Sequence, residues 1–192
     1  MRRAGQIAAI LLLTAGASTA QAADGTGKKL VDKLYADCDA ALSDPARVLT
    51  LGAAADGQST VMTTTDGNIV TATSAIPDAA EDVFGIMTVT AVKLPGGIHA
   101  SCVIMLSGRS VPSELRDEVH DAATAGALTL IGTDPVRIGG IGGGPALLSS
   151  GSEGQMRSEV LTNADFPPTA SVSVQSADNV ATVAIEKYRA AP

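Results

Sequence analysis

Aromatic side chains are almost missing from this sequence, which has no Trp, two Tyr and two Phe. Proteins that bind single-stranded nucleic acid usually stack the bases on aromatic rings along a basic groove. Here Asp and Glu number 20 against 13 for Lys and Arg, and the formal net charge of −7 would repel a polyanion. Nucleic acid is therefore excluded as a partner, and a sugar pocket lined by rings is disfavoured.

A long hydrophobic run is also missing. The apolar stretch from Ile7 to Ala17 is about half of the 20 or so residues that span a bilayer. It follows two arginines and precedes Ala20-Gln21-Ala22, the small-x-small pattern that signal peptidase cleaves. Residues 1–22 are predicted to be a secretory signal peptide cut after Ala22. Residues 23–192 should then be one periplasmic or secreted domain without a membrane span.

Cysteine is scarce as well, with Cys38 and Cys102 as the only two. In an exported protein an even number of cysteines favours a disulfide. Cys38 lies on the apolar stripe of a predicted helix and Cys102 on the apolar face of a predicted strand, so a bridge would pin the helix to a sheet. Two buried free thiols are the alternative. The C-x-x-C spacing of a redox-active pair is absent.

The hydrophobic pattern predicts an α+β protein in which an N-terminal helix and a mid-chain helix pack on an antiparallel sheet built from hairpins. Turn dipeptides such as Asp66-Gly67 separate the strands of each hairpin. Helices are expected at 28–42 and 112–125, with a short one after Asp44-Pro45. Strands are expected at 58–64, 68–74, 84–94, 98–106, 128–131, 155–162, 170–175 and 180–186.

Glycine and serine dominate residues 132–154, for which a long exposed loop is expected. Glycine-rich turns can hold anions on their backbone amides. The segment Gly139–Pro145 nevertheless lacks the third glycine of a dinucleotide fingerprint and the Gly-Lys-Ser/Thr of a phosphate loop. Arg137 beside it leaves a weak anion-site hypothesis, and no cofactor is predicted.

His99 and His120 are the only imidazoles, and their spacing does not fit a metal site, so no metal is predicted. His120 falls beside Asp117 and Asp121 on a helix, where a solvated partner of carboxylates is expected. His99 lies on a predicted strand and could act as a general base. No Gly-x-Ser-x-Gly elbow supplies a serine for it, and no catalytic residue is assigned.

These patterns favour an exported, non-catalytic interaction or inhibitor-like module of the cell envelope, with an unknown protein partner. Two other classes stay open. A hydrolase would use His99 or His120 with a serine or threonine nucleophile, and a small-ligand carrier would need a sizeable apolar pocket. A histidine converging with a carboxylate in a cleft would favour the hydrolase, whereas a flat surface would favour the interaction module.

Overall fold

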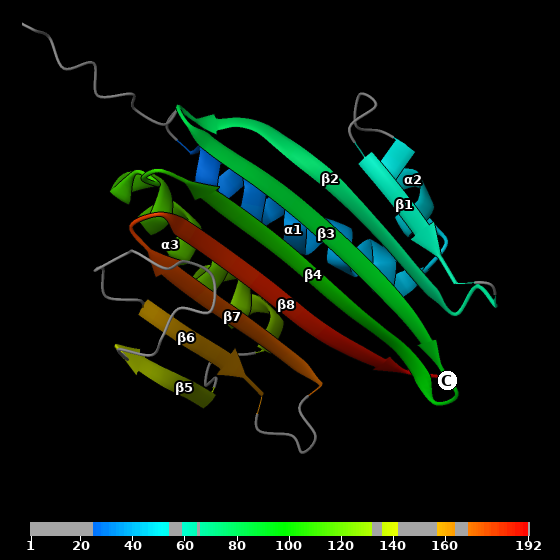
Figure 1. Ribbon diagram of the computed structural model, residues 1–192. Coiled ribbons are helices and arrows are strands. Elements are labelled where there is room, and N and C mark those ends of the chain that lie inside the picture. Colours follow the sequence, from blue (N-terminus) through cyan, green and yellow to red (C-terminus); the bar gives the residue numbers. More distant parts are fainter. Residues whose placement is uncertain are drawn as a thin grey trace, which may run out of the picture.

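The computed structural model describes residues 25–53, 59–64, 66–131, 136–141, 157–163 and 169–191. Their strands form one antiparallel eight-stranded sheet in the order β1-β2-β3-β4-β8-β7-β6-β5 (Figure 1). The elements are α1 (Thr26–Ser43), α2 (Arg47–Ala53), β1 (Ser59–Thr63), β2 (Ile69–Ala80), β3 (Val83–Leu94), β4 (Gly97–Gly108), α3 (Ser113–Ile131), β5 (Val136–Ile141), β6 (Arg157–Thr162), β7 (Ala170–Ala177) and β8 (Val180–Ala190).

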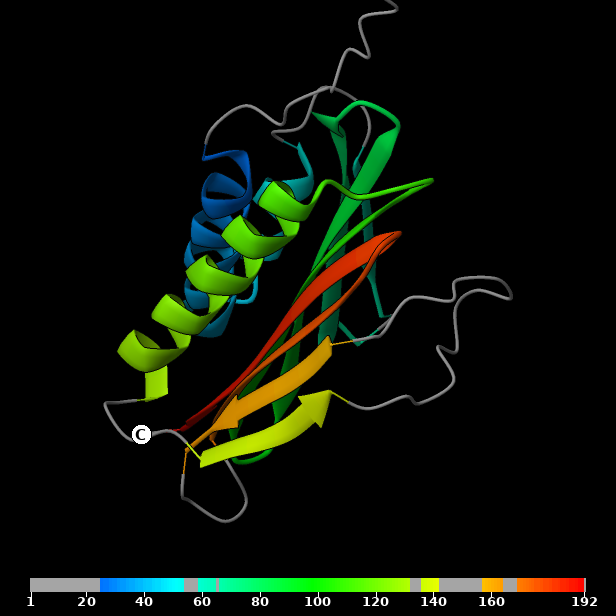
Figure 2. The ribbon, with the colours of Figure 1, turned by 90° about the vertical axis from the view of Figure 1, so that its left-hand side faces the viewer.

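All three helices lie on one side of the sheet, and no helix of the described residues covers the other side (Figure 2). The burial pattern of the strands agrees with this arrangement. Buried residues alternate with half-buried ones, as in β3 and β4, so only one face of the sheet is covered. The buried set points at the helices and includes Val89, Cys102 and Ile185. The fold is therefore an α+β sheet with one covered face, which confirms the predicted class.

Two glycines bring α1 and α3 into close contact. A Cβ on Gly27 would lie 2.8 Å from the Cβ of Glu118, and one on Gly126 would lie 2.2 Å from a ring carbon of Tyr35. The Tyr35 hydroxyl donates to the carbonyl oxygen of Ala123 at 2.9 Å. Because side chains are missing at the two contact points, the helix backbones can approach closely and share one core.

The start of α1 is held by a side chain of α3. Gly25 is the N-cap residue and has no side chain that could accept hydrogen bonds from the free amide groups of the first turn. The two carboxylate oxygens of Glu118 accept these hydrogen bonds instead, from the Gly25 amide at 2.9 Å and the Gly27 amide at 2.8 Å. A negative charge also suits the positive end of the helix dipole.

Two predicted segments differ from the structure. Residues 128–131 are the last turn of α3 rather than a strand, because the apolar run continues the helix, whose buried residues include Ala123 and Ala127. Residues 136–141 are strand β5, paired with β6, rather than loop. Backbone pairing with β6 overrides the poor strand propensity of glycine there. The rest of the predicted loop, including Gly139–Pro145 after Ile141, and the predicted signal peptide lie outside the described residues.

Candidate functional site

The side of the sheet opposite the helices is the broadest candidate surface. We call it the open face and define it by half-buried side chains of β2, β3, β4, β8 and β7. They include Thr71, Thr73, Ala75, Ile86, Thr88, Thr90, Val92, His99, Ser101, Val103, Met105, Thr182, Ala184, Glu186, Tyr188, Ser171 and Ser173. Strand register places them in rows across the sheet, for example Thr73, Thr88, Val103, Ala184 and Ser173.

Charge is nearly absent from the open face, although the chain as a whole is acidic. Among these residues, only His99 and Glu186 can carry a charge near neutral pH. Their side chains meet, with His99 Nε2 2.8 Å from one carboxylate oxygen of Glu186. The two groups can therefore satisfy each other, and the rest of the face carries hydroxyl and aliphatic side chains.

The threonine hydroxyl groups of β2 and β3 on this face bond sideways, to the neighbouring strand. The Thr71 and Thr90 hydroxyls lie 3.0 Å apart, and those of Thr73 and Thr88 lie 3.2 Å apart. A polar group that already has a partner costs less to remove from water than one that has none. The free-energy cost of removing the threonine rows from water is consequently lower than their hydroxyl content alone indicates.

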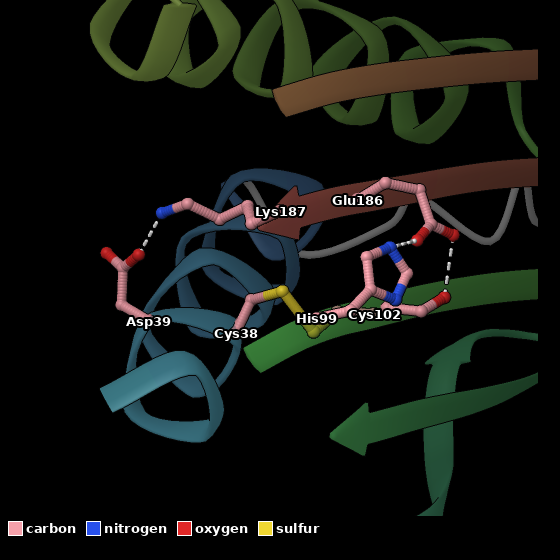
Figure 3. Close-up of a disulfide and its surroundings, with 7 residues drawn as sticks. Cys38, Asp39, His99, Cys102, Glu186 and Lys187 are labelled. Carbon is pink, nitrogen blue, oxygen red and sulfur yellow. Dashed lines mark hydrogen bonds and ion pairs between the residues drawn. A yellow bond between two sulfur atoms is a disulfide. The ribbon is translucent and has the colours of Figure 1, made fainter. Parts of the chain in front are cut away.

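Glu186 stands at the centre of a three-residue network. One carboxylate oxygen lies beside His99, and the other accepts a hydrogen bond from the Ser101 hydroxyl at 2.7 Å (Figure 3). In a hydrolytic triad the histidine stands between the serine and the acid, so that it can take the serine proton. Here the acid stands between the other two. The arrangement leaves Ser101 without a histidine base and does not favour the hydrolase.

His120 lies on the other side of the sheet, in a different environment. Its Nε2 is 3.2 Å from Glu159 of β6, and its Nδ1 is 3.4 Å from Asp121. Only 12% of its side chain is exposed, so the expectation of a solvated histidine is wrong. The packing of α3 on β6 and β7 buries the ring, and Glu159, rather than Asp117, is its main partner.

The predicted disulfide is present, and it joins α1 to β4. Cys38 and Cys102 are both fully buried, with 5.8 Å between their Cα atoms. Beside the bridge, Lys187 of β8 forms an ion pair with Asp39, the residue after Cys38 (Figure 3). A covalent disulfide and an ion pair therefore attach the middle of α1 to the centre of the sheet.

The sequence singled out His99 but not its partner. Glu186 is 87 positions away, and the two side chains meet because β8 pairs with β4. The pattern of the last hairpin places Glu186 at the end of a strand, but it does not predict which other strand pairs with that strand. Ser101 could have been linked to His99 by the two-residue strand period.

Other classes of site receive no support from the described part of the chain. No group of three or more His, Cys, Asp or Glu residues there could hold a metal ion. None of its helices is long and apolar enough to cross a membrane. Arg137 belongs to β5, whose side chains lie outside the description. Comparison of the chain with protein-family models, curated proteins and solved structures finds no match.

Proposed function

We propose that this protein is an exported, non-catalytic interaction module of the cell envelope that binds a second copy of itself through the open face. The observation that carries the proposal is a broad sheet surface, uncovered by any described helix, on which the side chains of His99 and Glu186 pair with each other. The centres of protein interfaces are depleted of charged residues in the same way. The buried disulfide fits an oxidising compartment.

The size of the surface suits a dimer. The five strands of the open face lie about 4.8 Å apart and so span roughly 24 Å, and about eight residues along each cover roughly 26 Å. The open face thus offers roughly 600 Å², which is the lower end of the area that each partner buries in a standard interface. Two such faces can pack as a sandwich with their strands about 30° apart, related by a twofold axis.

Charge directs the contact to this face. The chain carries a formal net charge of −7, so two copies repel each other wherever their acidic surfaces meet. Exposed carboxylates on the helix side include Asp32, Asp39 and Asp121. When two open faces meet, the His99–Glu186 pair of each copy is the only charged group that they bring together. The hydroxyl rows add little desolvation cost, because they already have hydrogen-bond partners.

The test introduces a charge at the centre of the open face. Thr88→Lys places an ammonium there on each copy, and we expect it to weaken dimerisation about 100-fold. Thr129→Lys is the matched control, because Thr129 is exposed on α3, away from this face. The readout is sedimentation equilibrium of the purified protein, in which the unmodified chain should dimerise with a micromolar Kd, common for interfaces of this size. A monomer at every concentration would overturn the proposal.

A further inference from the structure

An apolar cavity opens on the helix side of the sheet, between α1, α2 and the outer half of β2. Its volume is about 250 Å³, and its walls include the side chains of Leu30, Leu51, Ala72, Ile76, Met87 and Val89. These residues come from both helices and from two neighbouring strands. The cavity lies away from the His99–Glu186 network, so a ligand here would be separate from the proposed dimer contact.

Small residues on β2 and the length of that strand explain the cavity. β1 pairs with β2 only between Val70 and Ser74, while β2 continues to Ala80. On the helix side of β2, the side chains of Ala72 and Ser74 are too small to fill the space beneath α1 and α2. Protein cores normally fill such space at close to crystal density. An open, apolar gap beside a filled core is therefore suited to a ligand.

The charged groups at the cavity are an aspartate and a lysine one helical turn apart. Lys33 Nζ lies 2.5 Å from an Asp37 carboxylate oxygen, and both residues line the cavity. The Asp37 side chain is only 13% exposed, whereas 59% of Lys33 is exposed. The carboxylate is thus fixed in the wall, and the lysine can turn out to solvent. A cationic donor could take the place of Lys33 against Asp37.

We propose that this cavity binds a small cationic amphiphile, with its ammonium group on Asp37 and its apolar body against Leu51, Met87 and Val89. An apolar cavity of about 150 Å³ accepts benzene, so the volume here suits a body of roughly ten non-hydrogen atoms. The sign of the ligand charge follows from the buried carboxylate. The net charge of −7 also favours a cation over an anion.

Octylammonium, octanol and octanoate test the proposal, because they share one alkyl chain and differ in head-group charge. The measurement is a titration of the full mature chain labelled at its methyl groups, followed by NMR at concentrations below micelle formation. Octylammonium should shift the Leu51, Ile76 and Met87 methyl signals saturably, with a Kd of about 0.1 mM for a ligand of this size. Octanoate should bind at least tenfold more weakly.

Two variants on α1 distinguish ion pairing between the ligand and Asp37 from nonspecific hydrophobic binding. Asp37→Asn should reduce octylammonium affinity to that of octanol and leave octanol binding unchanged. Asp39→Asn is the matched control, since Asp39 faces β8 and does not line the cavity, and it should change neither affinity. The methyl spectrum itself reports whether each variant is folded. Unsaturable shifts, shifts confined to methyl groups of the open face, or octanoate binding as tight as octylammonium would each overturn the proposal.

Discussion

Removal of the Cys38–Cys102 disulfide, which joins α1 to β4, should destabilise the fold. The bridge closes a loop with a sequence separation of 64. The chain-entropy model assigns a loop of that length about 4 kcal/mol of stability, because the cross-link restricts the unfolded chain. For a chain of this size, that corresponds to a fall in Tm of roughly 8–16 °C.

The assay is urea unfolding of the purified protein with and without the double substitution Cys38→Ala and Cys102→Ala. The variant should unfold at lower urea, and its m-value should rise, because an uncrosslinked unfolded chain exposes more surface. Lys187→Ala is the control. It removes the neighbouring ion pair to Asp39, a partly exposed interaction that should contribute about 1 kcal/mol or less.

Two results would refute this reasoning. The first is a stability loss below about 1 kcal/mol with an unchanged m-value, since the entropic account requires both to change. The second is a pair of titratable thiols in protein taken from its native compartment. The second result would also remove the support that the disulfide gives to an oxidising environment.

The helix contact yields two further predictions. Gly126→Ala should destabilise the fold by about 1–3 kcal/mol, as overpacking does, because its Cβ would lie 2.2 Å from the Tyr35 ring; an unchanged Tm would contradict the contact. Burial raises the pKa of Tyr35 above its ordinary value of 10.0. Only the unfolded chain then ionises as pH rises past about 10, so stability should fall there. Urea unfolding at pH 9 and pH 11 should show a smaller fall for Tyr35→Phe.

Local patterns predicted much of this fold. The apolar stripe around Cys38 gave the first helix, and the two-residue period around Cys102 gave its strand face. The two cysteines then placed that helix against that strand. Turn chemistry at Asp66-Gly67 separated two strands that do pair as a hairpin. Apart from the cysteine pair, each of these signals lies within a few residues, where local side-chain periodicity and turn chemistry determine the structure.

The rest depends on contacts between distant segments. Residues 136–141 have weak strand propensity, and pairing with β6 makes them a strand. The open face is equally non-local. Its charge-poor character appears only when β2, β3, β4, β8 and β7 lie side by side, and Glu186 meets His99 only through the β4–β8 pairing. The cavity could not be predicted either, because it depends on where β1 stops along β2.

The shortage of aromatic side chains accounts for several of these features together. A core without large rings must be closed by bringing backbones near each other, and fully buried alanines such as Ala91, Ala100 and Ala123 allow this. Small side chains bury little apolar area each, and the hydrophobic free energy scales with that area. The disulfide adds stability that does not depend on side-chain size. On the helix side of β2, the small residues Ala72 and Ser74 line the gap that we assign to a ligand.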